Sequence, residues 1–223
     1  MTTLLNETIK DLKTNVSSHV VLPGDPNYDE VREIWNAMID RQPAVIVQAT
    51  NADEVSHIIK FARKHGLEIS IRGGGHNIAG NAVCDNGVMI DLSMMKNVRV
   101  DAQKMGAYVE PGATLGDFDK AAQVHRLATP VGINSTTGIA GLTLGGGFGW
   151  LTHKYGLTID NLVSAELITA DGNKLRTSEN ENADLFWAIR GGGGNFGVVT
   201  EFEFALHPVG PEILAGLIVF PFS

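Results

Sequence analysis

Glycine clusters and one histidine are the residues of this sequence whose types and spacing could do chemistry. The clusters occupy residues 73–75, 138–149 and 191–197, and each lies beside an apolar, strand-like run. Glycine has no Cβ, so its backbone N–H groups can approach an anion closely and can adopt a positive φ. Successive N–H groups in such a turn form an anion-binding concavity. Three such concavities in one domain suit a long, doubly phosphorylated ligand better than one small anion.

His76 follows the first glycine cluster directly, and Asn77 comes next. A neutral imidazole is a nucleophile, and a loop that cradles a ligand would hold this one beside it. A lone histidine is more often a surface or hydrogen-bonding residue, so on the residues alone that role stays open. Each glycine cluster taken singly has a similar alternative, as a tight turn in a compact β-rich domain.

Two common phosphate-binding patterns do not match these clusters. A P-loop needs G-x-x-x-x-G-K-[ST], and no glycine here is followed by Lys and then Ser or Thr. A dinucleotide fingerprint needs G-x-G-x-x-G between a strand and a helix, with an acidic residue about 20 positions later. Residues 145–149 (GGGFG) do not lie in that context. The sequence therefore argues against a P-loop and a Rossmann domain.

Composition narrows the class of protein. The chain has 223 residues, 17 Lys and Arg against 25 Asp and Glu, and a net charge of −8, which argues against a nucleic-acid or anionic-membrane partner. One cysteine excludes an intrachain disulfide framework and a multi-cysteine zinc site, and no metal site is expected. Glycine occurs 26 times, whereas average usage of roughly 7% gives about 16. The N-terminus lacks a signal-peptide pattern, so we expect a cytoplasmic protein.

A strand–helix–strand unit is expected to position the first glycine cluster. Residues 43–48 form a buried apolar run, and Asn51 is an N-cap candidate with Glu54 as its capping-box partner. The helix that follows ends at Gly66, and the alternating residues 67–72 form a strand that leads into the cluster. Two helices, at 4–12 and 28–38, are expected before this unit.

Short strands dominate the rest of the chain. We expect strands at 87–92, 98–101, 105–110, 162–170, 174–177 and 198–206, and helices from Thr114 to about Arg126 and at 183–189. The apolar residues 214–222 also look like a strand. Many short strands with a few helices predict the α+β class.

Four segments together resemble one known family. They are RGGGHN at 72–77, GIAGLTLGGGFG at 138–149, YGLTIDN at 155–161 and WAIRGGGGNFGVVT at 187–200. They are similar to the FAD-linked oxidases of the berberine bridge enzyme-like group, which have the vanillyl-alcohol oxidase fold. The resemblance implies a p-cresol methylhydroxylase-type FAD-binding domain of two α/β subdomains at 39–209. An N-terminal helical segment would occupy 1–38, and 210–223 would begin a truncated substrate domain.

The resemblance also implies the residues that hold FAD. His76 matches the histidine that bonds covalently to the 8α-methyl carbon of the flavin, and the loop around it matches the one whose N–H groups hold the pyrophosphate. Some members carry a second link through a cysteine at the position of Asn134, and an amide cannot form that thioether, so we expect attachment through His76 alone. The implied FAD-binding residues are Arg72, Gly73, Gly74, Gly75, His76, Asn77, Thr137, Gly138, Gly141, Leu142, Gly146, Gly147, Asn195 and Val199.

The function implied by the resemblance is that of an FAD-dependent oxidoreductase. A hydride would move from an alcohol, amine or related C–H substrate to flavin N5, and O2 would reoxidise the flavin. The catalytic base of such enzymes lies in a later part of the chain, so no catalytic residue is assigned here. Two alternatives remain open: a non-catalytic FAD-binding fragment, and an unstable product that binds nothing. The substrate and the oligomeric state are not predicted.

Overall fold

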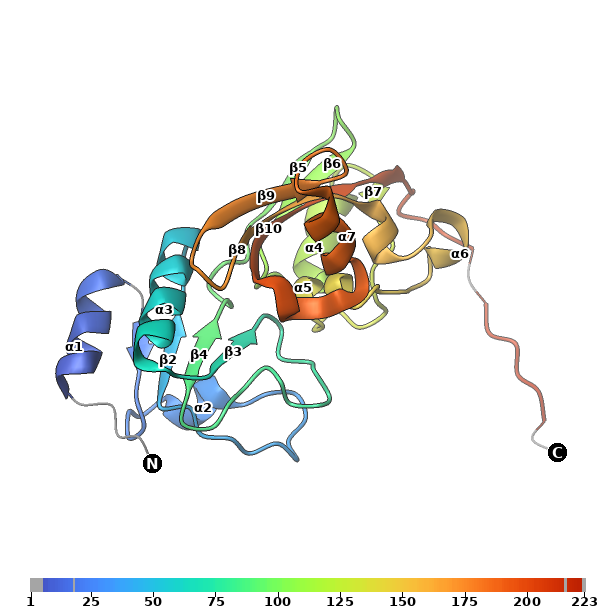
Figure 1. Ribbon diagram of the computed structural model, residues 1–223. Helices are drawn as coiled ribbons and strands as arrows, with labels where there is room; N and C mark the ends of the chain where they lie inside the picture. Colours follow the sequence, from blue (N-terminus) through green and yellow to red (C-terminus); the bar gives the residue numbers. More distant parts are fainter. Residues whose placement is uncertain (1–5, 18, 215, 222–223) are drawn as a thin grey trace.

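The computed structural model describes residues 6–17, 19–214 and 216–221. Two sheets lie side by side, each with its own helices (Figure 1). A four-stranded sheet has the order β1-β2-β4-β3, and a five-stranded sheet has the order β5-β6-β10-β8-β9. No helix in the described ranges is long and apolar enough to cross a membrane.

The four-stranded sheet confirms the predicted strand–helix–strand unit. Its strands are β1 (His19–Val21), β2 (Val45–Gln48), β3 (Ile69–Arg72) and β4 (Val88–Asp91). The last three are parallel, and β1 is an antiparallel edge. Val45 and Val47 pack into one core with α3 (Ala52–His65) and α1 (Asn6–Asn15), while Ile46 packs into another with Tyr28 of α2 (Tyr28–Arg32). The sheet is therefore buried on both faces, as parallel sheets are.

Helix α3 begins and ends as expected, but the prediction of a capping box between Asn51 and Glu54 is wrong. The Asn51 side chain accepts a hydrogen bond from the Glu54 backbone N–H, and Gly66 closes the helix in the left-handed conformation. The Glu54 carboxylate does not return to Asn51. It accepts hydrogen bonds from the backbone N–H groups of Thr50, at 2.9 Å, and Ser17, at 3.0 Å. The buried carboxylate therefore ties the segment after α1 to the start of α3.

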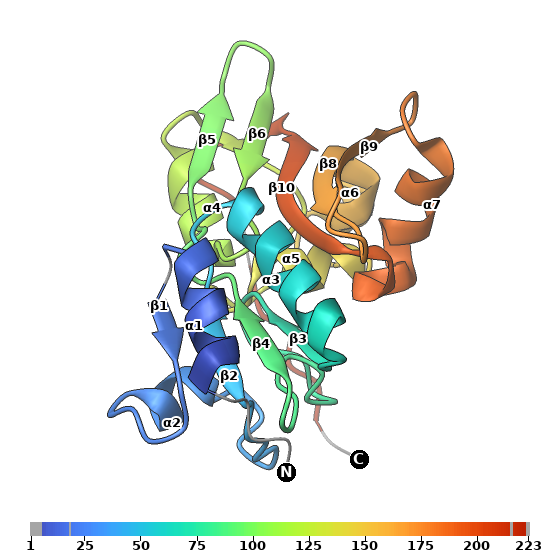
Figure 2. The ribbon, with the colours of Figure 1, turned by 60° about the vertical axis from the view of Figure 1, so that its left-hand side comes forward.

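The five-stranded sheet is antiparallel (Figure 2). Helices cover one face, and α3 packs against Ile168 and Val198 at one end of the sheet. Its strands are β5 (Val98–Asp101), β6 (Gly106–Val109), β8 (Leu162–Ile168), β9 (Lys174–Ser178) and β10 (Val198–Ala205). The covering helices are α4 (Leu115–Gln123), α5 (Ile139–Leu144) and α7 (Ala183–Gly192). Phe118 of α4 and Phe202 and Phe204 of β10 are fully buried in the shared core.

Short elements connect these units. They are β7 (Leu127–Ala128), which pairs with β11 (His207–Pro208), the helix α6 (Thr152–Tyr155), and the 3-10 helices η1 (Thr158–Asn161) and η2 (Gly193–Phe196). Helix α4 ends at Gln123 rather than near Arg126, which has a φ of 57°. The backbone of Arg126 is therefore left-handed and cannot continue the helix.

Two predicted elements are wrong. The helix expected at 28–38 ends at Arg32, because Glu33 is already extended with ψ 141°. The strand expected at 214–222 is not formed in the described residues 214 and 216–221, which are exposed and pair with no strand in the described part of the chain. The helix expected at 4–12 is present as α1, and the predicted residues 4 and 5 lie outside the described residues.

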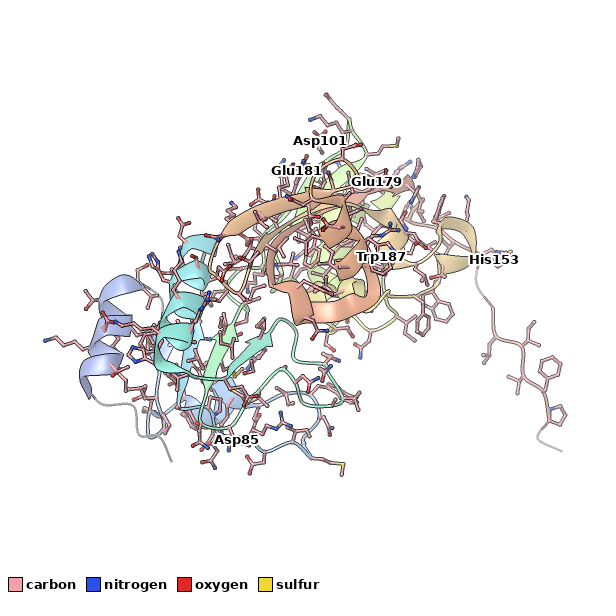
Figure 3. The ribbon with its side chains drawn as sticks, in the orientation of Figure 1. Asp85, Asp101, His153, Glu179, Glu181 and Trp187 are labelled. Carbon is pink, nitrogen blue, oxygen red and sulfur yellow. The ribbon has the colours of Figure 1, made fainter. Side chains whose placement is uncertain are left out.

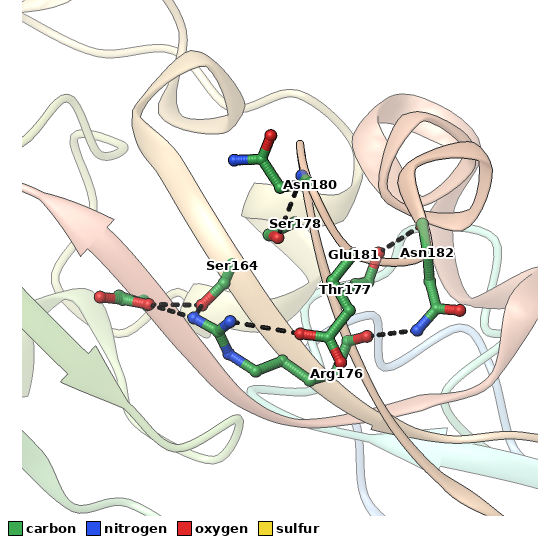
Figure 4. A network of polar contacts seen from close by, with 8 residues as sticks. Ser164, Arg176, Thr177, Ser178, Asn180, Glu181 and Asn182 are labelled. Carbon is green, nitrogen blue, oxygen red and sulfur yellow. Dashed lines mark hydrogen bonds and ion pairs between the residues drawn. The ribbon is translucent and has the colours of Figure 1, made fainter.

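Glu203 is the centre of a polar network on the face of the five-stranded sheet opposite Phe202 and Phe204. Its carboxylate accepts hydrogen bonds from Tyr108 Oη at 3.0 Å, Ser164 Oγ, and Arg176 Nη2 at 3.2 Å. Figure 4 shows Arg176 reaching from this network to Glu181, 3.4 Å away. Burial raises the pKa of Glu203, but hydrogen bonds from Ser164, Tyr108 and Arg176 outweigh it and leave the pKa below its usual value.

Glu203→Gln is expected to lower the free energy of unfolding at pH 7 by about 1–2 kcal/mol, because a charged acceptor is lost. The pKa of Glu203 is depressed in the folded state, so its stabilisation is present above the unfolded-state pKa and disappears as the pH falls through the folded-state pKa. Urea unfolding of both proteins at pH 7 and at about pH 3.5 should therefore show the difference shrinking at acid pH.

Glu201→Gln is the matched control on the same strand. Burial first, and then Glu166, raise the pKa of Glu201. Its ionised form therefore opposes folding, and the variant should be no less stable than the parent at pH 7. Equal losses for the two variants at pH 7 would contradict the assignment of the network.

Candidate functional site

The carboxyl ends of β3 and β4 hold the start of the candidate site. Asp91, the last residue of β4, is completely buried. Its carboxylate accepts hydrogen bonds from Gln48 Nε2 and Ser93 Oγ, each at 3.0 Å, and lies 3.8 Å from Arg72 Nε. Arg72 ends β3 and leads into the first glycine cluster. Open parallel sheets bind ligands beyond the carboxyl ends of their strands.

The Arg72 side chain is committed to the protein rather than free for a ligand. Its Nη1 donates hydrogen bonds to the carbonyl oxygens of Val31 and Glu33. This guanidinium therefore fastens the segment after α2 to the end of β3. Arg72 could therefore favour the binding of an anion through its positive charge beside the loop, while its Nη1 hydrogen bonds stay within the protein.

Residues 33–39 lie along the loop that carries His76. Trp35 N–H donates to the carbonyl of Gly75 at 3.1 Å, and Asn36 Nδ2 donates to the carbonyl of Ile78 at 2.8 Å. The indole of Trp35 stacks on the imidazole of His76, with ring centroids 5.6 Å apart and planes 20° apart. These contacts are what the segment makes in place of the predicted helix.

The first two glycine clusters touch through their backbones. A Cβ on Gly74 would lie 2.3 Å from the Gly138 nitrogen, and a Cβ on Gly138 would lie 2.4 Å from the Gly74 nitrogen. A Cβ on Gly73 would meet the Pro111 carbonyl oxygen at 3.0 Å. No side chain fits between the two loops, so their backbone groups are brought together as the sequence predicts.

The third glycine cluster reaches the same region through α5. Helix α5 starts directly after Gly138 and packs against α7 and η2, which contain residues 191–196. Asn195 is exposed, and its Nδ2 donates to the Gly192 carbonyl at 2.8 Å. Val199 of β10 is buried and pairs with Leu167 of β8 on one side. On the other side of β10, strand β6 pairs only with residues 202–205 in the described part of the chain. The backbone before Phe202 therefore has a free edge on that side.

The predicted residues on and after α5 divide into three groups. Gly141 is exposed, and a Cβ there would have nothing within 4 Å, so its face of α5 is open. Leu142 is half-buried against the core of the five-stranded sheet. Gly146 and Gly147 have φ values of 108° and 71°, and their carbonyls accept hydrogen bonds from η1 at 3.0 Å. These two glycines therefore form a turn that holds η1 beside the end of α5.

His76 has a polar partner in the segment before Gly138. Its Nε2 lies 3.3 Å from Thr136 Oγ1, which in turn lies 2.9 Å from Asn134 Oδ1. The neighbouring Thr137 carbonyl accepts from Leu115 N–H at 2.9 Å, which fixes the segment to α4. Asn77 caps its own loop, because its Oδ1 accepts from the Asn81 N–H at 3.0 Å.

Trp35, Asp91 and Thr136 are residues that sequence reasoning did not find. Trp35 lies in a segment read as a helix, and Asp91 is one acid in an apolar strand. Thr136 stands in an ordinary run of polar residues, NSTT at 134–137. An Asn side chain often accepts a hydrogen bond from the backbone N–H two residues later, so Asn134 was the available hint of a turn at Thr136.

Other surface features lie away from these loops. A hollow of about 580 Å³ is lined by residues 160–163, 176, 178–181 and 205, and none of them is a predicted FAD residue. Trp187 lies on α7 and is 78% exposed, and His153 lies on α6 at the edge of the molecule (Figure 3). The described residues contain no group of three or more His, Cys, Asp or Glu side chains that could hold a metal ion.

Comparison with known proteins identifies the family. The family described as FAD binding domain matches residues 43–178. The (R)-6-hydroxynicotine oxidase of Paenarthrobacter nicotinovorans is 39% identical over 204 residues, which is 92% of this chain and 44% of the relative. An FAD-linked oxidoreductase of Dictyostelium discoideum is 37% identical over 214 residues, 96% of this chain and 47% of the relative.

Solved structures agree with the sequence comparison. The berberine bridge enzyme-like protein 1 of Physcomitrella patens is 30% identical with a TM-score of 0.86, over 90% of this chain and 44% of that one. A glucooligosaccharide oxidase from Acremonium strictum is 33% identical with a TM-score of 0.85, over 90% and 42%. The chain thus spans less than half the length of these relatives. It belongs to the FAD-binding domain family of the FAD-linked oxidoreductases, and the predicted α+β, p-cresol methylhydroxylase-type fold is confirmed.

Proposed function

We propose that this chain binds FAD beside its touching glycine loops and attaches it covalently through His76. The backbone contact of Gly74 with Gly138 carries the proposal, because it brings the N–H groups of two glycine loops closer together than any residue with a Cβ would allow. Unencumbered N–H groups at such a junction suit a pyrophosphate. The open face of Gly141 and the free edge of β10 before Phe202 offer room for the rest of a long cofactor.

A covalent link is supported by a relative and by the placement of His76. The glucooligosaccharide oxidase of Acremonium strictum has a 6-S-cysteinyl, 8α-N1-histidyl FAD. In this chain His76 directly follows the glycines that touch Gly138, so a cofactor held there would lie beside the imidazole. Asn134 cannot form a thioether, so His76 is the single attachment point that we propose.

The bound flavin would supply the capacity to accept a hydride from an alcohol, amine or related C–H substrate. This chain would orient the flavin and shield one side of it, and O2 would be the electron acceptor. A second candidate is an FAD-binding fragment without turnover. The two candidates share the cofactor site and differ in turnover alone.

Acid precipitation tests the covalent proposal. The chain is expressed with FAD available, precipitated with trichloroacetic acid and washed, and flavin absorbance is then measured in the redissolved pellet. Yellow colour that stays with the protein is expected. A pellet without flavin, from a protein that bound FAD before precipitation, would retain FAD binding and refute the covalent bond. A protein that binds no FAD would refute the whole proposal.

A further inference from the structure

We propose that Thr136 and Asn134 act as positioning residues that set the tautomer of His76 and make Nδ1 its bonding nitrogen. This inference rests on the proposed covalent attachment, for which the N1-histidyl link of the Acremonium strictum relative already points to Nδ1. It adds the residues of this chain that select that nitrogen. The observation that carries it is the chain of contacts His76 Nε2, Thr136 Oγ1 and Asn134 Oδ1, with spacings of 3.3 Å and 2.9 Å.

The orientation of the Asn134 amide fixes the direction of this chain. The backbone N–H of Thr136 lies 3.1 Å from Asn134 Oδ1, and an N–H group can only donate. The atom that it faces must therefore be the amide oxygen and not the NH2 group. The same oxygen faces the Thr136 hydroxyl, so the hydroxyl donates its hydrogen to Asn134.

The state of the Thr136 hydroxyl then determines the tautomer of His76. A hydroxyl has one hydrogen, and Thr136 has already donated it to Asn134. Toward His76 it can only accept, so Nε2 must carry the hydrogen. A neutral imidazole has one N–H, and the lone pair is therefore on Nδ1. Within the described residues Nδ1 makes no hydrogen bond, so its lone pair is available.

Trp35 fixes the orientation of the His76 ring, and the choice of tautomer depends on that orientation. The stacked indole covers one face of the ring, and the backbone N–H of Trp35 is anchored on the Gly75 carbonyl. Exchanging the two nitrogens by a ring flip would break the Nε2 contact with Thr136. The imidazole is therefore held by an edge contact and a face contact at the same time.

Bond formation needs this arrangement of protons. With FAD bound, the Nδ1 lone pair would form the bond to the 8α carbon, one C–H proton of the methyl group would leave, and the flavin would take up the electron pair of that C–H bond. Once Nδ1 is alkylated, the imidazole would become neutral again by losing the hydrogen on Nε2. Thr136 is exposed and contacts Nε2, so it would lie on the path of that proton to water. Dioxygen then takes the two electrons and two protons as H2O2, so the net change is His, FAD and O2 giving the linked cofactor and H2O2.

The test compares the rate of covalent attachment in variants of the FAD-free chain. FAD is added to refolded or FAD-depleted protein, and acid-stable flavin is followed with time. Thr136→Val removes the acceptor at nearly constant volume and is expected to slow attachment about tenfold or more, by analogy with the losses on removing the hydrogen-bond partner that orients a metal-ligating histidine. Thr136→Ser restores the acceptor and should recover most of the rate. Ser135→Ala removes a neighbouring exposed hydroxyl as the matched control and should leave the rate unchanged.

The outcomes separate this inference from the proposed function. If the parent chain binds FAD but never retains it through acid, the covalent proposal fails, and this inference fails with it. If the parent acquires acid-stable FAD and Thr136→Val does so at the same rate, the tautomer inference alone is refuted. If Thr136→Val does not fold, Asn134→Ala provides the second variant, and it should slow attachment because it frees the Thr136 hydroxyl to donate.

A nuclear magnetic resonance measurement tests the tautomer without any flavin. Nitrogen-15 correlation of the imidazole in the FAD-free parent should show His76 protonated at Nε2 and bare at Nδ1. The His76→Ala protein identifies the signal. Thr136→Val should redistribute the hydrogen between the two nitrogens. A parent protein with the hydrogen on Nδ1 would overturn the inference whatever the attachment rates.

Discussion

Gly138→Ala is expected to destabilise the chain by about 3 kcal/mol or more, because both atoms in its way are backbone. The new Cβ would lie 2.4 Å from the Gly74 nitrogen and 2.7 Å from the Gly74 Cα. Neither can rotate aside as the end of a side chain would. Relief requires the two loops to separate, which would also remove the proposed pyrophosphate site. Urea unfolding should show a lower midpoint, and FAD titration should show weaker binding.

Gly141→Ala is the matched control three residues along the same segment. A Cβ there meets nothing within 4 Å, and the residue lies inside α5. Alanine in a helix is favoured over glycine by about 0.5–1 kcal/mol, so this variant should be as stable as the parent or slightly more so. A Gly138→Ala protein that unfolds at the same urea concentration as the parent would show that the loops do not need their close approach.

The comparison of Gly138 with Gly141 shows what a sequence can and cannot say about a glycine-rich site. Both residues belong to one cluster and look alike in the sequence. One is fixed by contact with Gly74, a residue in another loop, and the other faces open space. The chemistry of the cluster could be predicted because glycine has one special property. Which glycines serve packing and which leave room for a ligand depends on tertiary contacts.

Elements defined by local signals could be predicted. Helix α3 has a polar N-cap, an apolar stripe and a C-terminal glycine, and β2 is a run of buried β-branched residues. The prediction of a helix over 28–38 is wrong because its apolar residues, although spaced as in a helix, make contacts with other parts of the chain. Trp35 stacks on His76 and Ile34 packs against the core that contains Tyr28, so the chain follows a loop and not a helix axis. Tertiary contacts override such short patterns.

Helix α5 shows the opposite error. Its sequence, IAGLTL, contains a glycine and a threonine, which are weak helix formers, and its periodicity is poor. It is helical in the fold because Ile139 and Leu144 are buried in the core of the five-stranded sheet. The glycine on its open side is what a helix would carry where another molecule must come close.

His76→Ala is expected to abolish acid-stable flavin completely while leaving FAD binding in place. The imidazole is the single proposed bonding group, so its removal leaves no atom to form the link. The glycine loops would still offer their N–H groups, since the Gly74–Gly138 contact involves no atom of the His76 side chain. The variant should therefore bind FAD, lose it all on acid precipitation, and release it as unmodified FAD that chromatography of the supernatant identifies.

His153→Ala is the control for histidine loss in general. His153 is exposed on α6, and its variant should retain acid-stable flavin like the parent. Acid-stable flavin in His76→Ala would place the bond on another residue. Loss of FAD binding altogether, in a variant that still unfolds cooperatively at the parent's urea midpoint, would mean that the imidazole contributes most of the affinity. The glycine loops would then shape the site rather than hold the cofactor, because their backbone groups would be intact and yet insufficient.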